Sequence, residues 1–265
     1  MLDNAVTCGR AIETVAGPLL RAYTPYEPIK FDYQPFLYGI SGANGDLGFI
    51  GEEGSRKSAL TVARKVAEEI YPGAFMASLN LGGSKHDKIV TIADLMGDVD
   101  LVCDGVIFRR GSGIVSSVFV ADCAPVAVYG KNHIGLIHFG RPEAVDGVIA
   151  EFCQQWFGQG ESPDSTIVMV GPRIRGNSYK IRPEEAEQYK QMPHLVGAVN
   201  TYGDEPTFSL GSTAIVQFSQ TSITADRILL SLFDTYAFPE LASKRREWDL
   251  HQRPSWRDGY FIGSW

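Results

Sequence analysis

Hydrophobic positions recur at helical spacing over residues 56–70, the first strongly patterned stretch of the chain. The apolar members of this stripe are Leu60, Ala63, Ala67 and Ile70. Charged residues fill the opposite face, which is typical of an amphipathic helix. Ser55 precedes the stretch and is a residue type that caps helices, while Pro72 and Gly73 end it. The pattern therefore predicts a capped surface helix.

A different pattern, a nearly continuous run of β-branched and aromatic residues, covers residues 113–129 and 134–138. Such runs are typical of buried strands. Only the polar residues 130–132 separate the two, and so short a connection predicts antiparallel neighbours. Asp122 and Pro125 interrupt the first run, and proline cannot donate to a ladder, so we expect the strand to bend or end there.

The register of this hairpin decides whether Cys123 and His138 can meet. If Lys131 and Asn132 form a two-residue turn, Cys123 lies opposite Gly140 and shares a sheet face with His138. A three-residue turn would shift the pairing by one residue and place the two side chains on opposite faces.

The other patterned segments alternate between the two types of element. Strands are predicted over residues 75–81, 88–93, 101–108, 166–170 and 214–218, and helices over residues 142–157, 183–191 and 225–233. No repeat or low-complexity linker divides the chain, so we expect a single domain over residues 1–265. Alternating elements with an antiparallel hairpin indicate a mixed α+β fold.

Composition narrows the function classes. Hydrophobic residues make up 44% and charged residues 21% of the chain, values typical of a soluble globular protein. The net charge is −7 and the longest basic run is Lys244-Arg245-Arg246, which disfavours a nucleic-acid partner. No signal-like start or membrane span is evident, so we expect a cytoplasmic protein with no membrane partner that acts on a small molecule.

Cysteine and histidine are the candidate chemical groups. Four cysteines are too few and too scattered for a disulfide framework, so we expect free thiols. Cys123 and His138 are singled out by the hairpin geometry, and Arg141 at a predicted helix start adds a candidate anion site. The remaining candidates are expected to be structural side chains: Cys8, Cys103, Cys153, His133 and His194.

Residues 119–125 (FVADCAP) resemble the Ala-Asp-Cys-x-Pro pattern of the YfiH-like family, also called the multicopper polyphenol oxidoreductase or laccase-domain family. Further segments resemble that family in the same order along the chain: residues 84–90, 104–107, 137–140, 170–174 and 177–181. The resemblance thus extends over about residues 84–189. The chain departs from it where Arg141-Pro142-Glu143 replaces the family's Trp-Arg-Gly, and where only Ser243-Lys244-Arg245-Arg246 is left of a terminal Ser-Tyr-Arg-Arg segment.

The resemblance implies a fold with two packed β-sheets flanked by helices, in α/β/β/α layers. It also implies that His86, Cys123 and His138 face one pocket, act as the catalytic residues and bind zinc. Two histidines and one cysteine with an open fourth position are what a catalytic zinc site needs. We expect Arg141, Arg173 and Asp122 to bind substrate, with an arginine beside an anion.

The activity implied by the resemblance is purine nucleoside processing: phosphorolysis of adenosine, inosine or methylthioadenosine, or deamination of adenosine. A first alternative is a Cys/His hydrolase or amidase acting on a peptidoglycan precursor, with Asp122 or Asp87 orienting the histidine. A second alternative is a ligand-binding homologue without catalysis. Copper-dependent oxidation of polyphenols fits less well, because multicopper sites need more ligands than five histidines provide, and we favour zinc over copper.

Overall fold

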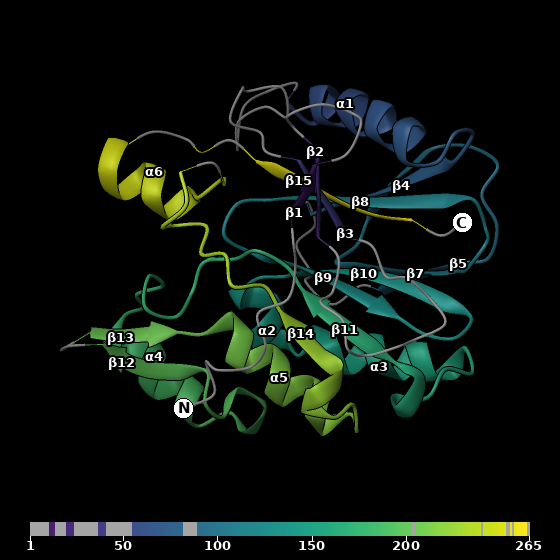
Figure 1. Cartoon of the computed structure of the whole chain (residues 1–265). Helices are drawn as coiled ribbons and strands as arrows, with labels where there is room; N and C mark the ends of the chain where they lie inside the picture. Colours follow the sequence, from purple (N-terminus) through teal and green to yellow (C-terminus); the bar gives the residue numbers. More distant parts are fainter. Residues whose placement is uncertain are drawn as a thin grey trace.

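A computed structural model describes residues 11–13, 20–23, 37–40, 55–81, 89–202, 205–239, 241–252, 255 and 257–263. Two β-sheets lie face to face in it, and helices cover their outer faces (Figure 1). The layers follow the order α/β/β/α, with α1 on one side and α2, α3 and α5 on the other. The predicted mixed α+β fold of packed sheets flanked by helices is confirmed.

The first sheet has the strand order β1-β2-β3-β15-β8-β4-β6. Its strands are β1 (Ala11–Glu13), β2 (Leu20–Tyr23), β3 (Leu37–Ile40), β4 (Phe75–Asn80), β6 (Val99–Val102), β8 (Ile114–Val120) and β15 (Asp258–Gly263). The second sheet has the order β14-β11-β9-β10-β7-β5. Its strands are β5 (Ile89–Ile92), β7 (Gly105–Arg109), β9 (Ala124–Tyr129), β10 (His133–Phe139), β11 (Ile167–Val170) and β14 (Ile228–Leu230). A separate ribbon pairs β12 (Val199–Tyr202) with β13 (Glu205–Phe208).

Helices connect and cover these strands. They are α1 (Ser55–Ile70), α2 (Arg141–Asp146), α3 (Val148–Gly158), α4 (Pro183–Lys190), α5 (Leu210–Gln220) and α6 (Lys244–His251), with short 3₁₀ turns η1 (Pro163–Ser165), η2 (Pro193–Leu195) and η3 (Ala225–Arg227). None of the helices in the described part of the chain combines the length and apolar character that a membrane-spanning segment needs.

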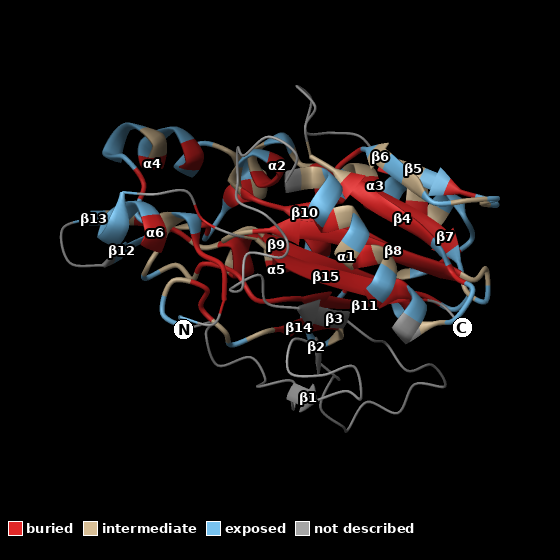
Figure 2. Cartoon of the chain, turned by 90° about the horizontal axis from the view of Figure 1, so that it is seen from above, coloured by how far each residue is buried: buried red, intermediate tan, exposed pale blue. Residues whose placement is uncertain are grey.

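Three apolar cores hold the layers together, and the strands between them are almost entirely buried (Figure 2). One core lies between α1 and the first sheet, one between the two sheets, and one between the second sheet and its covering helices. On β8, Val118 faces the core between the sheets and Phe119 faces the α1 side. Strands buried on both faces have no polar face, which explains the continuous apolar run that the sequence shows here.

The expected break beside Asp122 separates the two sheets. β8 ends at Val120 in the first sheet and β9 begins at Ala124 in the second. Asp122 at the turn has a φ of 78°, in the left-handed region that residues other than glycine rarely adopt. Cys123 therefore follows a sharp, strained turn at the edge of the inter-sheet layer.

The predicted two-residue turn is also confirmed. The Gly130 N–H donates to the His133 carbonyl at 3.0 Å, and His138 pairs with Pro125 along β9 and β10. This register places Cys123 opposite Gly140. Cys123 packs against the core between the sheets, on the face that carries every second residue of β10 up to His138.

Two predicted elements are each divided in the structure. The strand predicted over residues 101–108 is in fact β6 and β7, which belong to different sheets and meet at Cys103 and Asp104. The helix predicted over residues 142–157 is α2 followed by α3, because Gly147 between them has a φ of 78° that no α-helix can contain.

Two predictions near the carboxy terminus are wrong. Residues 214–218 are not a strand but part of α5, which Ser209 caps and whose buried residues Leu210, Ala214 and Phe218 recur every fourth position. A local β-branched run concealed this longer period. The helix predicted over residues 225–233 is η3 followed by β14, a strand that pairs in parallel with β11.

A buried carboxylate closes the hairpin between β9 and β10. Glu161 accepts hydrogen bonds from the N–H groups of Lys131 and Asn132, both at 2.7 Å, and lies 3.1 Å from the His133 Nδ1 atom. We expect Glu161→Gln to lower the free energy of unfolding by about 2 kcal/mol, because an amide cannot accept all three hydrogen bonds.

Thermal unfolding should show this loss as a decrease in the melting temperature of roughly 4–8 °C. Glu187→Gln is the matched control, since Glu187 is exposed and its carboxylate pairs with Lys190 at the surface. Equal melting temperatures for the two variants would contradict a role of Glu161 in holding the hairpin closed.

Candidate functional site

Cys123 and His138 come together at the edge of the inter-sheet layer. Cys123 lies just before β9, diagonally across from His138 on β10, and its charge acts on the His138 imidazole. Cys123 is half-buried, whereas only 7% of His138 is exposed. Gly140 makes this approach feasible, because a Cβ atom at that position would lie 2.7 Å from the Cys123 Sγ atom. A side chain at this position would displace the Cys123 thiol or the Glu143 carboxylate.

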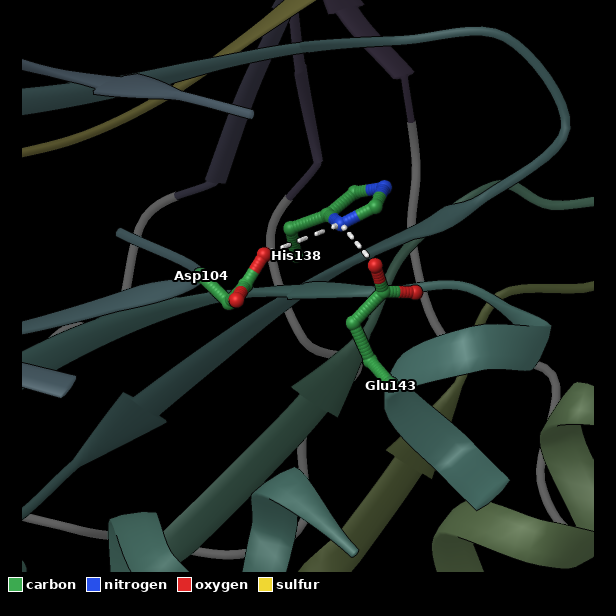
Figure 3. Close-up of side chains that lie close together, drawn as sticks. All are labelled: Asp104, His138 and Glu143. Atoms are coloured by element: carbon green, nitrogen blue, oxygen red, sulfur yellow. Dashed lines mark ion pairs between the residues drawn. The ribbon is translucent and has the colours of Figure 1, made fainter. Parts of the chain in front are cut away.

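Two buried carboxylates face the Nδ1 atom of the His138 ring (Figure 3). The Glu143 Oε1 atom lies 3.3 Å from His138 Nδ1, and the Asp104 Oδ1 atom lies 4.0 Å from it. The second ring nitrogen points away from both carboxylates (Figure 3). The contact with Glu143 is an ion-pair distance, although its geometry falls short of a hydrogen bond.

Local structure fixes both carboxylates. Asp104 lies just before β7, and its carbonyl accepts a hydrogen bond from the His138 N–H at 2.7 Å. Glu143 occupies the third position of α2, where its Oε2 atom accepts a hydrogen bond from the Gly140 N–H at 2.9 Å. The first free N–H of this helix is therefore satisfied by a carboxylate of the chain itself.

The electrostatic environment favours positive charge at His138. Burial lowers the pKa of its imidazole, but the negative charge of Cys123 and the Glu143 carboxylate raise it, and the net pKa lies above the ordinary histidine value. A proton and a metal ion are both cations, so either is stabilised by the same groups.

The residues around His138 could bind a metal ion. Asp104, His138 and Glu143 offer ligand atoms that all lie within 4.8 Å of one another. A second arrangement is open to the same imidazole, with Cys123 as sulfur ligand and the two carboxylates orienting the ring. Both arrangements place His138 at the centre.

His86, the third expected metal ligand, lies outside the described residues. Ile89, three residues later, begins β5 and is level with Gly105 of the neighbouring strand β7. Gly105 in turn pairs with Ile137, the residue before His138. The first residue of β5 is therefore level, across β7, with the residue that precedes His138 on β10.

The three predicted substrate-binding residues lie in different surroundings. Arg141 begins α2 immediately after Gly140, and its guanidinium donates to Glu185 Oε2 at 3.3 Å. The Asp122 carboxylate accepts hydrogen bonds from the Thr235 hydroxyl and the Arg245 N–H. Arg173 is buried and donates to the Ser231 carbonyl at 2.9 Å. The structure places Arg141 next to Gly140, against which the Cys123 thiol lies, and Asp122 immediately before Cys123 in the chain.

Sequence reasoning overlooked two residues near Cys123. The Tyr179 ring has the guanidinium groups of Arg141 and Arg245 over it, at 5.7 and 5.9 Å from its centroid. Burial raises the pKa of the Tyr179 hydroxyl, the negative charge of Cys123 raises it further, and Arg141 opposes them. Tyr179 lies in residues 177–181, one of the segments that resemble the family, so the resemblance could have indicated it. No pattern in the sequence indicates that Arg245 lies near Cys123.

The residues expected to be structural have structural contacts. His133 pairs with Glu161, and the His194 Nε2 atom lies 2.8 Å from the Val145 carbonyl oxygen. Cys103, Cys123 and Cys153 are free thiols, as predicted, and Cys8 lies outside the described residues.

A family model and two curated proteins are similar to this chain. A family model described as "Multi-copper polyphenol oxidoreductase laccase" matches residues 62–251. The "Purine nucleoside phosphorylase ORF3" of Streptomyces griseus is 28% identical over 153 residues, 56% of this chain and 61% of that protein. A "Purine nucleoside phosphorylase" of Aquifex aeolicus (strain VF5) is 26% identical over 161 residues, 61% of this chain and 72% of that protein.

A solved structure supports the fold. The crystal structure of the Bacillus licheniformis hypothetical protein YfiH has a TM-score of 0.71 at 17% identity, covering 95% of this chain and 98% of that chain. At this identity the likeness shows a shared fold. The alignment with the Streptomyces protein covers less than two thirds of that protein's length.

Proposed function

This chain belongs to the multi-copper polyphenol oxidoreductase laccase family, and from that membership we propose that it is an enzyme that processes purine nucleosides at a site built on Cys123 and His138. Both curated relatives carry the name purine nucleoside phosphorylase. The observation that supports the proposal most directly is the half-buried thiol beside an imidazole that two buried carboxylates hold. We propose phosphorolysis of adenosine, inosine or methylthioadenosine, or deamination of adenosine, as the reaction.

The donor set fits a zinc ion. A thiol and an imidazole are zinc ligands, and a carboxylate behind the second nitrogen is typical of metal-binding histidines. Cys123 and His138 with Glu143 at 3.3 Å match this pattern. We propose that Cys123, His138 and His86 hold the ion. When bound, zinc would supply a Lewis acid that lowers the pKa of a coordinated water to about 7.

The residues of the chain have separate roles in this proposal. Glu143 and Asp104 hold Nδ1 of His138, so that the other ring nitrogen faces the reacting groups. Arg141, half-buried and next to Gly140, attracts an anion. Copper chemistry on phenols is disfavoured because the whole chain has five histidines.

One observation favours a second candidate function. Cys123, His138 and Glu143 form a series of thiol, imidazole and carboxylate that resembles the catalytic groups of cysteine hydrolases. In that case the thiolate attacks a carbonyl, and the substrate class is an amide such as a peptidoglycan precursor. Alkylation of Cys123 by iodoacetamide in metal-free protein, with loss of amidase activity, would support it.

The proposed function is tested by nucleoside turnover. Purified protein is incubated with adenosine, inosine or methylthioadenosine, with and without phosphate and zinc, and the products are separated by chromatography. We expect free base that appears only with phosphate, or inosine formed from adenosine. Cys123→Ala serves as the control for contaminating enzymes. Absence of turnover under every metal condition would contradict the proposal.

A further inference from the structure

Two arginines that are distant in the sequence converge beside Cys123. Arg141 comes from the start of α2 and Arg245 from α6, yet both guanidinium groups lie over the ring of Tyr179, at 5.7 and 5.9 Å from its centroid. All three side chains are half-buried, so each keeps an exposed part. Arg141 directly follows Gly140, the residue against which the Cys123 thiol lies, and its contact with Tyr179 places the aromatic ring next to the candidate site.

Asp122 fixes the position of Arg245. Its Oδ2 atom accepts a hydrogen bond from the Arg245 backbone N–H at 2.8 Å, and its Oδ1 atom accepts one from the Thr235 hydroxyl at 2.7 Å. The carbonyl of the same residue accepts a hydrogen bond from the Ile174 N–H at 2.9 Å. Asp122, the residue just before Cys123, thus anchors the carboxy-terminal segment. The backbone of Arg245 is therefore fixed close to Cys123.

The charges of the two arginines are not equally balanced. Arg141 pairs with Glu185 at 3.3 Å. The Arg245 guanidinium donates to the Lys180 carbonyl at 3.2 Å, and no carboxylate among the described residues forms an ion pair with it. Both guanidinium groups add positive charge around one ring, and a bound anion would offset this charge. Each guanidinium has five N–H donors in a planar fork that suits phosphate oxygens.

We propose that Arg141, Tyr179 and Arg245 form the binding site for the phosphate that attacks the nucleoside, a proposal that rests on the phosphorolysis described above. In that step a phosphate oxygen forms a bond to the ribose C1′ carbon while the bond from C1′ to the purine nitrogen breaks. The electron pair of the broken bond stays on the purine, which takes up a proton from water and leaves as the free base. Ribose 1-phosphate is the second product, and no oxidant or reductant is required.

The experiment measures phosphate binding separately from catalysis. Binding of inorganic phosphate to the metal-loaded protein is followed by isothermal titration calorimetry, and the phosphate KM is determined in the nucleoside assay. We expect Arg245→Met to raise the Kd for phosphate roughly tenfold or more, the effect of losing charged hydrogen bonds. Arg245→Lys should retain part of the affinity, because it keeps the charge without the fork.

Arg109→Met is the matched control. Arg109 is exposed at the far end of β7, where it pairs with His133 at the opposite end of β10 from His138. Melting temperatures establish that every variant is folded. Unchanged phosphate affinity in a folded Arg245→Met protein overturns the phosphate site even if nucleosides are cleaved. Phosphate binding that depends on Arg245 without any nucleoside turnover upholds the site and contradicts the proposed function instead.

Discussion

Replacement of Cys123 by alanine is expected to remove bound zinc and to lower nucleoside turnover by several orders of magnitude, as the loss of a central catalytic group does in other enzymes. The physical reason is that the proposed site uses Cys123 as the sulfur ligand beside His138, and Cys123 is half-buried and accessible. Zinc is measured by elemental analysis of protein dialysed against a defined metal buffer, and turnover by product chromatography.

Two further variants make this experiment specific. Cys153→Ala is the matched control, because Cys153 is a buried thiol in α3 with Thr221 as its hydrogen-bond partner. It should retain zinc and turnover while losing some stability. Cys123→Asp keeps an anionic ligand but lacks a thiol. Retained zinc with partial turnover in this variant indicates a ligand role, whereas retained zinc with no turnover indicates a nucleophile. Full zinc content and full activity in Cys123→Ala would contradict both roles.

The contact between Cys123 and His138 could be predicted from the sequence because the turn between their strands is short. A two-residue connection leaves few registers open, and the observed pairing of His138 with Pro125 is the one that the turn predicts. The family match over residues 62–251 extends beyond residues 84–189, the stretch that carries the family's motifs. Local sequence patterns were therefore sufficient to predict the pairing of β9 with β10 at the centre of the second sheet.

Elements that depend on distant partners could not be predicted in the same way. β14 pairs with β11, from which it is separated in the sequence by a long connection that includes α5. Its three apolar residues are compatible with a helix or with a strand. β15 lies between β3 and β8 in the middle of the first sheet although it ends the described chain. Neither position follows from local propensity, because tertiary packing determines it.

The same limit applies to the residues around the site. Glu143 reads as an ordinary helix-start carboxylate, and only the fold shows that its second oxygen faces His138. Arg245 belongs to a short basic run that no sequence pattern connects with Cys123, yet its N–H donates to Asp122 beside Cys123. The contact between Asp122 and Arg245 joins residues that are 123 positions apart in the sequence.

Replacement of Glu143 by glutamine is expected to reduce zinc affinity and turnover by roughly 10- to 100-fold, the usual effect of removing the partner that orients a metal-binding histidine. Glutamine retains an oxygen that can accept the Gly140 N–H, so the cap of α2 remains while the negative charge 3.3 Å from His138 is lost. The melting temperature should therefore change little compared with the loss of zinc affinity.

Comparison with Asp104→Asn ranks the two carboxylates. The Asp104 Oδ1 atom is 4.0 Å from His138 Nδ1 and the Glu143 Oε1 atom is 3.3 Å from it, so the charge of Glu143 acts more strongly on the imidazole. We expect the smaller loss of zinc affinity for Asp104→Asn, measured by competition with a fluorescent chelator. If Glu143→Gln binds zinc as tightly as the unmodified protein, Glu143 serves only to cap α2. If both variants lose zinc completely, the ion is bound by Asp104, His138 and Glu143 themselves, and Cys123 acts as a nucleophile beside it.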